Sequence, residues 1–266
     1  MNHTDANNQY RSTAYTDSRQ QKYYELEDQS WWYQHREKIF LFLINQFFNK
    51  KQMILDIGGG NGFNTKAVQN AGYDVTLIEP TEKACENAKE RGCKKVLNIP
   101  FQEYKGLISQ FMCTDVLEHI EEEESFLKNV YDKMPQGGVG LLSVPAFMNL
   151  WSSEDEADGH FRRYIIARLT EVVHKVGFEV LYSNYCFQFL WIPIFVRRHL
   201  LEKLPFIHKV SERNAEEEKR VTDKQFLEPE GVVGKGLRFF ENRELNKIYC
   251  EKKISYGSSI VCVVKK

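Results

Sequence analysis

The amino-acid sequence predicts an α/β fold in which a mostly parallel β-sheet is covered by helices on both faces. Between Met53 and Phe187, short apolar segments of β character alternate with segments of helical periodicity, a pattern typical of parallel sheets. The 266 residues are 42% hydrophobic and 13% aromatic, so the chain can fill a core and is not disordered throughout. A formal charge of −1 argues against a basic surface that coats nucleic acid, and no nucleic-acid partner is expected.

The expected elements follow one another along the chain. Residues 1–22 are polar and are expected to be flexible, and one domain is expected over 23–266. Within it, a helical lid over 23–50 precedes a core over 51–186, an insertion over 187–253 and a last strand over 254–266. The core is predicted to contain strands over 53–57, 73–80, 94–99, 107–116, 139–145 and 178–187, and helices over 63–72, 81–92, 121–134 and 168–177.

Three features favour a cytoplasmic location. The N-terminal segment lacks the apolar core of a signal peptide. No apolar run approaches the ~20 residues that span a bilayer. The six cysteines form no CxxC pair, which indicates reduced thiols and not a disulfide framework or a zinc site.

A glycine-rich loop, Asp56-Ile57-Gly58-Gly59-Gly60-Asn61-Gly62, lies between the first strand and the helix that follows it. Glycines there allow a ligand to approach the main chain, and the helix presents free N–H groups to it. Glu79 ends the second strand, where an acid can accept hydrogen bonds from both hydroxyls of a ribose. A nicotinamide-binding loop would have its third glycine at position 63, which is Phe63 in this chain.

This loop, with Asp56 before it, resembles the first motif of class I S-adenosylmethionine (AdoMet) methyltransferases. Thr114-Asp115-Val116-Leu117-Glu118-His119-Ile120 resembles the exit of that family's fourth strand, and Pro135-Gln136-Gly137-Gly138 resembles its turn before the fifth strand. The resemblance implies a Rossmann-like, doubly wound sheet of seven strands with an antiparallel last strand. It implies AdoMet as cofactor and S-adenosylhomocysteine as product. The cofactor-binding residues that it implies are Asp56, Gly58, Gly59, Gly60, Gly62, Glu79, Pro80, Phe101, Asp115 and Val116.

A second group of residues is expected on the substrate side. Residues 146–164 follow the fifth strand and, together with Trp31-Trp32-Tyr33 and Arg36, resemble a bacterial methyltransferase subgroup associated with surface polysaccharides and specialised metabolites. Ligands of doubly wound folds bind beyond the carboxyl ends of the strands, so these side chains should face the pocket. The alternatives are core packing for the tryptophans and salt bridges for the arginines. The candidate substrate-binding residues are Trp32, Arg36, Trp151, Arg162, Arg163 and Tyr164.

Transfer to a hydroxyl requires a base. His160 and His119 are candidates because imidazole has an unperturbed pKa of ~6.5, and Asp155 is expected to orient an imidazole or to act as the base. Asp115, Glu118 and His119 also resemble a cluster that binds a divalent metal in some ubiquinone-pathway O-methyltransferases. Relatives with the same residues use no metal, and no metal is assigned.

The most apolar stretch, residues 187–198, ends in Arg197 and Arg198. It is too short to cross a membrane, and Pro193 is expected to break a regular helix. It is expected to form a pocket wall or a dimer surface, or else to contact a membrane or a lipid-linked substrate. Either a monomer or a homodimer is compatible with the sequence.

These observations predict an AdoMet-dependent methyltransferase that acts on an oxygen of a small molecule such as a sugar, a glycolipid precursor or a related metabolite, with nitrogen as the less favoured acceptor atom. A nicotinamide-dependent reductase or epimerase is disfavoured by Phe63 and by the lack of a Tyr-x-x-x-Lys pair. A cofactor-binding protein without turnover remains the third alternative.

Overall fold

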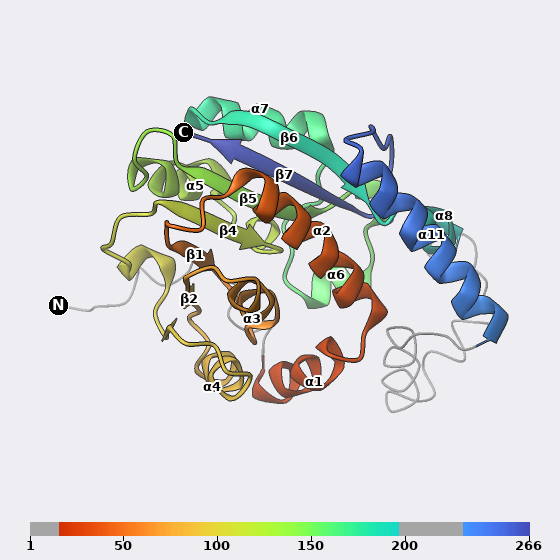
Figure 1. Ribbon diagram of the computed structural model, residues 1–266, viewed down its shortest axis with the longest axis horizontal. Coiled ribbons are helices and arrows are strands. Elements are labelled where there is room, and N and C mark those ends of the chain that lie inside the picture. The colour runs from red at the N-terminus through yellow and green to blue at the C-terminus, as the bar shows by residue number, and fades with distance from the viewer. Residues whose placement is uncertain (1–15, 197–230) are drawn as a thin grey trace.

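The computed structural model describes residues 16–196 and 231–266. They form a seven-stranded sheet in the order β3-β2-β1-β4-β5-β7-β6 (Figure 1). Strand β7 is antiparallel to both of its neighbours, while the neighbouring strands from β3 to β5 are parallel. The predicted doubly wound sheet with an antiparallel last strand is confirmed. The strands are β1 Ile54–Ile57, β2 Val75–Ile78, β3 Val96–Leu97, β4 Gln110–Thr114, β5 Val139–Pro145, β6 Glu179–Cys186 and β7 Ser259–Lys265.

Helices cover both faces of this sheet. Every residue of β1, β2 and β4 is buried, as expected for parallel strands enclosed on two sides. Helix α2 crosses in front of the sheet in Figure 1. The core helices α5 and α7 pack against each other, and the N-terminal helix α2 (Trp31–Phe47) packs against α3. The core helices are α3 Phe63–Asn70, α4 Glu82–Glu90, α5 Glu123–Asp132 and α7 Ile166–Val176.

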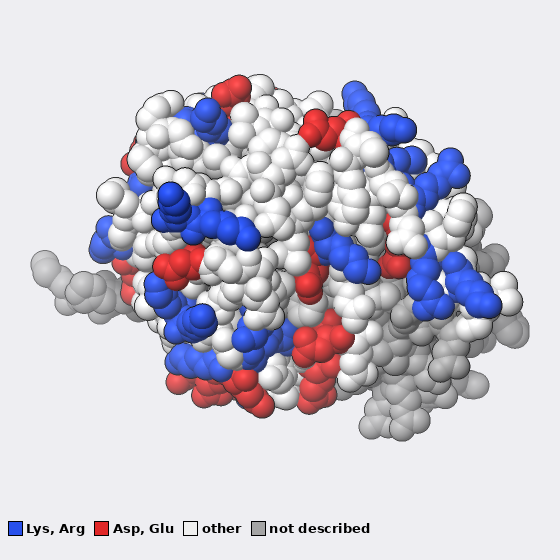
Figure 2. All heavy atoms as spheres, viewed as in Figure 1, with Lys and Arg blue, Asp and Glu red and all other residues white. Residues whose placement is uncertain are grey.

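Basic and acidic side chains are interspersed over most of the face shown in Figure 2, as the near-zero net charge leads one to expect. Within the described residues, no helix combines the length and the apolar character needed to cross a membrane.

The N-terminal region forms two helices, α1 (Asp17–Glu27) and α2 (Trp31–Phe47). Helix α1 therefore begins before the boundary expected at residue 22, while residues 1–15 lie outside the described part. Ile39, Phe40 and Leu43 of α2 are buried on one face, which is the amphipathic spacing of a helix that packs on a core.

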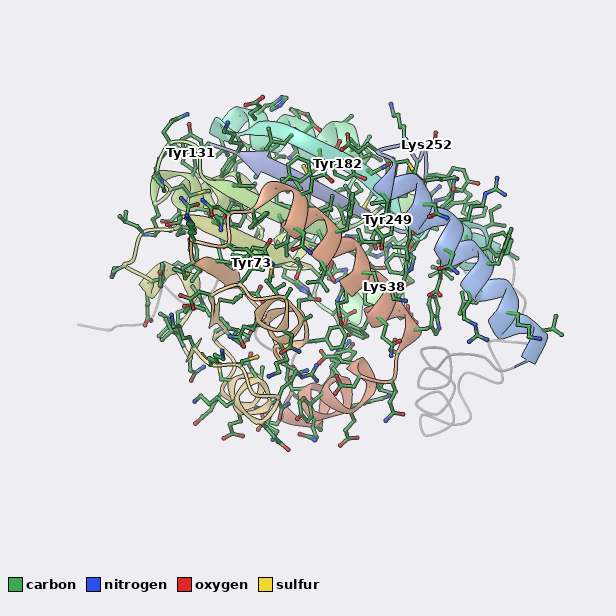
Figure 3. All side chains as sticks on the ribbon, viewed as in Figure 1. Lys38, Tyr73, Tyr131, Tyr182, Tyr249 and Lys252 are labelled. Atoms are coloured by element: carbon green, nitrogen blue, oxygen red, sulfur yellow. The ribbon has the colours of Figure 1, made fainter. Side chains whose placement is uncertain are left out.

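The expected insertion contributes α8 (Gln188–Val196) and α11 (Gly231–Tyr249). Tyr249, labelled in Figure 3, contacts Phe42 of α2 with ring centroids 4.6 Å apart. Contrary to expectation, Pro193 lies inside α8. It removes one backbone donor, but Trp191 and Phe195 stack one turn apart on the helix. Arg197, Arg198 and the charged run 211–224 fall outside the described residues.

Candidate active site

A cavity of about 1330 Å³ lies beyond the carboxyl ends of β1, β2, β4 and β5, where ligands of doubly wound sheets bind. Helices α1, α2 and α8 and the loop between β5 and α7 contribute further parts of its wall. The structure brings together predicted cofactor-binding, catalytic and substrate-binding residues from distant parts of the chain. Those that line the cavity are Trp32, Arg36, Gly58, Gly59, Gly60, Glu79, Pro80, Asp115, Val116, His119, His160 and Arg163.

The glycine loop needs glycine for two different reasons. Gly58 and Gly60 have positive φ angles of 70° and 51°, which side chains disfavour. A Cβ on Gly58 would lie 2.6 Å from Cγ2 of Val116, whereas a Cβ on Gly60 would meet no atom within 4 Å. The space above Gly60 is therefore open to the cavity, and a ligand can approach the backbone there.

The Glu79 carboxylate is fixed at the edge of the cavity. Its Oε2 accepts a hydrogen bond from the backbone N–H of Gly60 at 3.2 Å, and its Oε1 accepts one from that of Thr81 at 2.9 Å. Burial raises the pKa of Glu79. These bonds link the glycine loop to the end of β2 and orient the acid toward the cavity that both line.

Three predicted cofactor residues lie outside the cavity wall. Asp56 is buried and accepts a hydrogen bond from Oγ1 of Thr65 at 2.5 Å, and burial raises its pKa to about 7. Gly62 begins α3 in the left-handed conformation. Phe101 packs on Phe126 with ring centroids 5.2 Å apart. These three residues support the site from behind, and Pro100 lines the cavity in place of Phe101.

An ion pair joins Arg36 of α2 to Asp115 at the end of β4. Asp115 has a φ of 56°, an uncommon conformation for a residue with a side chain, and it accepts a hydrogen bond from Oγ of Ser143 at 2.7 Å. The Arg36 guanidinium lies 4.2 Å from the ring centroid of Trp32, a cation–π distance. The pair ties the covering helix to the sheet, so Asp115 is held from both sides.

His160 is held by a buried carboxylate. Its Nδ1 lies 2.8 Å from Oδ1 of Asp155. Asp155 also binds Arg163 through two bonds, from Nε to Oδ1 at 2.7 Å and from one terminal nitrogen to Oδ2 at 3.0 Å. Although burial by itself would raise it, the pKa of Asp155 is lowered because His160 and Arg163 bond to the carboxylate. An ionised Asp155 favours the tautomer with the proton on Nδ1 of His160 and a lone pair on Nε2.

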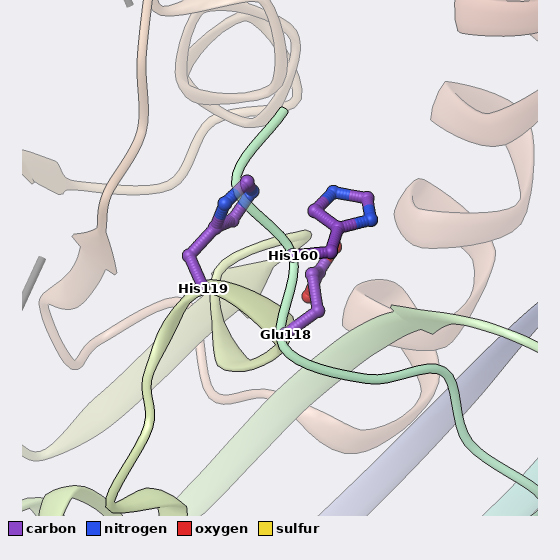
Figure 4. Close-up of side chains that lie close together, drawn as sticks. All are labelled: Glu118, His119 and His160. Atoms are coloured by element: carbon purple, nitrogen blue, oxygen red, sulfur yellow. The ribbon is translucent and has the colours of Figure 1, made fainter. Parts of the chain in front are cut away.

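His119 lies beside His160, with ring centroids 4.6 Å apart, and Figure 4 shows Glu118 next to both imidazoles. Burial and the neighbouring His160 lower the pKa of His119 to about 3. At neutral pH this imidazole is uncharged and a weak base, which disfavours the predicted catalytic role and leaves His160 as the stronger candidate.

The donor atoms of Glu118, His119 and His160 lie within 4.8 Å of one another, and these residues are the group in the described chain that could hold a metal ion. One carboxylate and two imidazoles form a ligand set that suits Mn²⁺ or Fe²⁺. This set is not typical of a structural zinc site, in which four ligands enclose the metal. This group of possible metal ligands differs from the cluster expected from the sequence. Asp115 is bonded to Arg36 and Ser143, and His160 takes its place beside Glu118 and His119.

Glu118 should make the ligand-free protein less stable as the pH rises. Burial raises its pKa to about 8 from 4.5, so the folded state holds a proton that the unfolded state has released between these values. The stabilisation that this proton gives to the folded state is complete below pH 4.5 and is lost as the pH rises through 8. Denaturant titrations should show that Glu118→Gln removes a downward slope of up to about 1.4 kcal/mol per pH unit. Glu103→Gln, at an exposed cavity carboxyl, is the control, and an equal slope in both variants would contradict the assignment.

The substrate roles expected for Trp151, Arg162 and Tyr164 are corrected by the structure. Trp151 donates to Oε1 of Glu156 at 3.3 Å and lies outside the cavity wall. Tyr164 is 1% exposed, and its hydroxyl donates to the buried Glu123. Arg162 pairs with the same carboxylate at 3.2 Å. All three stabilise the loop between β5 and α7.

Arg162→Ala is therefore expected to affect stability and not ligand binding. Its guanidinium donates to the carbonyl oxygens of Ile120 and Glu121, both at 2.7 Å. Loss of these charge-assisted bonds should lower the free energy of unfolding by about 1–3 kcal/mol, measured by urea denaturation, while the affinity for AdoMet stays unchanged. A weaker affinity at unchanged stability would show that Arg162 faces the ligand after all.

Helix α1 supplies cavity residues that the sequence did not reveal, namely Gln20, Tyr23 and Glu27. The side-chain amide of Asn61 in the glycine loop donates to the carbonyl oxygen of Gln20 and to Oε1 of Glu27, both at 3.3 Å. Arg91 pairs with Oε2 of Glu27 at 2.9 Å. The two buried residues of α1, Gln20 and Glu27, are both polar, so hydrophobic periodicity carried no signal for this contact.

Several known proteins are similar to this chain. A family described as a methyltransferase domain matches residues 31–183, more than half of the chain. The ubiquinone biosynthesis O-methyltransferase of Rickettsia canadensis is 30% identical over 101 residues, which cover 35% of this chain and 43% of that protein. The mitochondrial ubiquinone biosynthesis O-methyltransferase of Schizosaccharomyces pombe is 33% identical over 110 residues, 38% of this chain and 39% of that protein. The chain thus aligns with less than half the length of these relatives.

Solved structures agree with the fold. Phosphoethanolamine N-methyltransferase 2 of Haemonchus contortus, in complex with AdoMet, has a TM-score of 0.57 and 17% identity, covering 96% of this chain and 58% of that one. An AdoMet-dependent methyltransferase of Archaeoglobus fulgidus has a TM-score of 0.51 and 16% identity, covering 86% of this chain and 92% of that one. The chain therefore belongs to the family described as a methyltransferase domain, and it has the class I methyltransferase fold that its glycine loop predicted.

Proposed function

We propose that this protein transfers the methyl group of AdoMet to an oxygen atom of a small-molecule acceptor, with His160 as the general base. The observation that carries the proposal is the His160–Asp155 pair at 2.8 Å, because His160 lines the same cavity as Gly60 and Glu79. When bound, AdoMet supplies an electrophilic methyl group on a sulfonium.

The residues at the glycine loop fit this cofactor. The open space above Gly60 allows close approach to the backbone, and Glu79 offers carboxylate oxygens for the hydroxyls of a ribose. Pro80 and Pro100 line the same cavity and add flat apolar surface on the side where the adenine is expected. Asp56 supports this part of the site through Thr65.

The protein's part in catalysis is to align the acceptor, to exclude water and to remove a proton. Asp155 orients the imidazole and stabilises the charge that His160 gains when it accepts the acceptor's proton. Arg163 holds Asp155 in place through two hydrogen bonds. Helices α1 and α2 cover the cavity, with Tyr23, Trp31 and Trp32 in its wall.

The acceptor that best fits the cavity combines a hydroxyl with an apolar portion. His160 and Arg163 provide a polar region, whereas Trp31, Leu190 and Ile194 provide an apolar one. A glycolipid precursor or a related amphipathic metabolite matches both regions better than a free sugar does. Transfer to oxygen also accords with the names of the ubiquinone biosynthesis O-methyltransferases to which the chain is similar.

Calorimetric titration and a turnover assay test the proposal together. AdoMet should bind and NADH should not, and hydroxylated amphipathic acceptors should cause release of S-adenosylhomocysteine. Binding of NADH without AdoMet would favour a nicotinamide-dependent reductase or epimerase. Binding of AdoMet without turnover on any acceptor in the panel would favour a cofactor-binding protein.

A further inference from the structure

Helix α8 is apolar on every side, yet none of its side chains is buried. Apolar helices of this kind are ordinarily enclosed by a protein core or by a membrane. One side of α8 lines the cavity through Leu190, Pro193 and Ile194. Elsewhere on the helix, Ile192 is 56% exposed and Val196 is 38% exposed, so α8 has both a side that lines the cavity and exposed apolar side chains.

The apolar surface of α8 continues onto α11. Phe240 of α11 stacks on Phe189 of α8 with ring centroids 6.4 Å apart. The first half of α11 exposes four large apolar side chains: Phe240 is 51% exposed, Phe239 60%, Val233 68% and Val232 85%. Scattered apolar side chains are common on protein surfaces, but several exposed ones on two helices that pack together favour an interaction site.

The exposed charges of α11 all have one sign. Lys235, Arg238 and Arg243 are exposed, whereas the two carboxylates, Glu241 and Glu244, are buried. Glu244 is bonded to the buried His35 at 3.0 Å, which removes it from the surface. Figure 2 shows basic side chains along α11.

These basic residues border the apolar ones. Val232, Phe239 and Arg243 are separated by seven and four positions, so they lie on one side of the helix. Basic residues beside aromatic and aliphatic ones on the same helix are typical of helices that lie in the interface of an anionic bilayer.

We propose that α8 and α11 together form a surface, the α8–α11 surface, that binds an anionic lipid bilayer from one side. Charge complementarity favours lipid over a second copy of this chain, because a two-fold interface would bring the same basic residues toward one another. Docking would place the α8 wall of the cavity against the lipid, so an amphipathic acceptor could enter from the bilayer. That last point rests on the proposed methyl transfer, whereas the docking itself does not.

Vesicle flotation of the full chain tests the docking without any acceptor. Vesicles of phosphatidylcholine with 30% phosphatidylglycerol should bind the protein at low salt, and vesicles of phosphatidylcholine alone should bind it more weakly. The variant Lys235→Glu/Arg243→Glu should reduce the association constant by about tenfold or more, since each cation near an anionic surface contributes substantially. The variant Val232→Gln/Val233→Gln should also reduce it, because it removes the two most exposed large apolar side chains of α11.

A matched control makes the same kinds of change elsewhere. Leu107→Ser/Lys105→Glu alters one apolar residue, 77% exposed, and one exposed cation before β4, at the opposite ends of the strands from the cavity. Vesicle binding of this variant should stay within twofold of wild type. Titration with S-adenosylhomocysteine and thermal denaturation verify that each variant is folded, so loss of docking is distinguished from loss of the cofactor site.

Three results would overturn the proposal: no binding to anionic vesicles, equal binding to neutral and anionic vesicles, or binding that neither surface variant weakens. Light scattering provides a fourth test. If the wild type is a dimer that Val232→Gln/Val233→Gln converts to a monomer, and no vesicles bind, the α8–α11 surface is a subunit interface and the proposal is wrong.

Discussion

Replacing Gly60 with valine is expected to abolish AdoMet binding. The Cβ and both methyl groups would project into the cavity, because the space above Gly60 contains no protein atom within 4 Å. The ligand and the new side chain would compete for that space. Titration calorimetry should show a dissociation constant raised by about 100-fold or more, equivalent to about 2.8 kcal/mol or more of lost binding free energy.

Gly137→Val provides the matched control for backbone strain. Gly137 has a φ of 83°, and a Cβ there would also meet no atom within 4 Å, but it lies in the turn before β5, outside the cavity wall. Both substitutions place a branched side chain in the left-handed region, at a cost of about 1–2 kcal/mol in stability. Only Gly60→Val should lose AdoMet. Retention of normal affinity by Gly60→Val would show that the cofactor does not lie over the glycine loop.

His160→Ala is expected to slow methyl transfer about 10²–10⁴-fold while leaving AdoMet affinity within about twofold. In the proposed mechanism this imidazole, which is bonded to Asp155 in the cavity wall, accepts the proton of the acceptor. Single-turnover measurements with an acceptor found in the turnover screen separate the chemical step from binding. His174→Ala, at an exposed histidine of α7, should behave as wild type.

Asp155→Asn refines this test, since His160 and Asp155 should act as a unit. The amide cannot stabilise the charge that His160 gains, and it weakens the bonds with Arg163. The double variant His160→Ala/Asp155→Asn should be little slower than His160→Ala alone, because residues that act together are non-additive. Full activity of His160→Ala would refute its role as the base, and additive losses would show that Asp155 acts separately.

The glycine-loop side of the cavity could be predicted because its signals are local. A buried strand, a glycine loop and a helix follow one another within residues 53–72, and Glu79 ends the next strand. The carboxyl ends of parallel strands meet at one edge of the sheet, so residues after β1, β2 and β4 come together without knowledge of the packing. The structure places Gly58, Gly60 and Glu79 in one cavity wall.

The substrate side was predicted less completely, and Arg162 and Arg163 show why. The sequence treats these neighbours alike, but Arg162 pairs with Glu123 behind the loop and Arg163 binds Asp155 at the cavity. Tyr164 also bonds to Glu123. Side chains two positions apart in an extended chain lie on the same side, so Arg162 and Tyr164 face Glu123 while Arg163 faces the other way. Which side faces the cavity depends on how the loop packs on α5, and no local pattern records that.

The sequence by itself determined the class of fold, the order of its elements and the glycine-loop end of the cavity, since periodicity and glycine loops are short-range properties of the chain. Only the tertiary structure decided that the polar helix α1 covers the cavity through Gln20 and Glu27. Tertiary packing also set Glu118, His119 and His160 side by side and, among the described residues, left no side chain of α8 buried. Such contacts join residues far apart in the chain, and their free energy depends on burial, direction and partner, which exist only once the chain has folded.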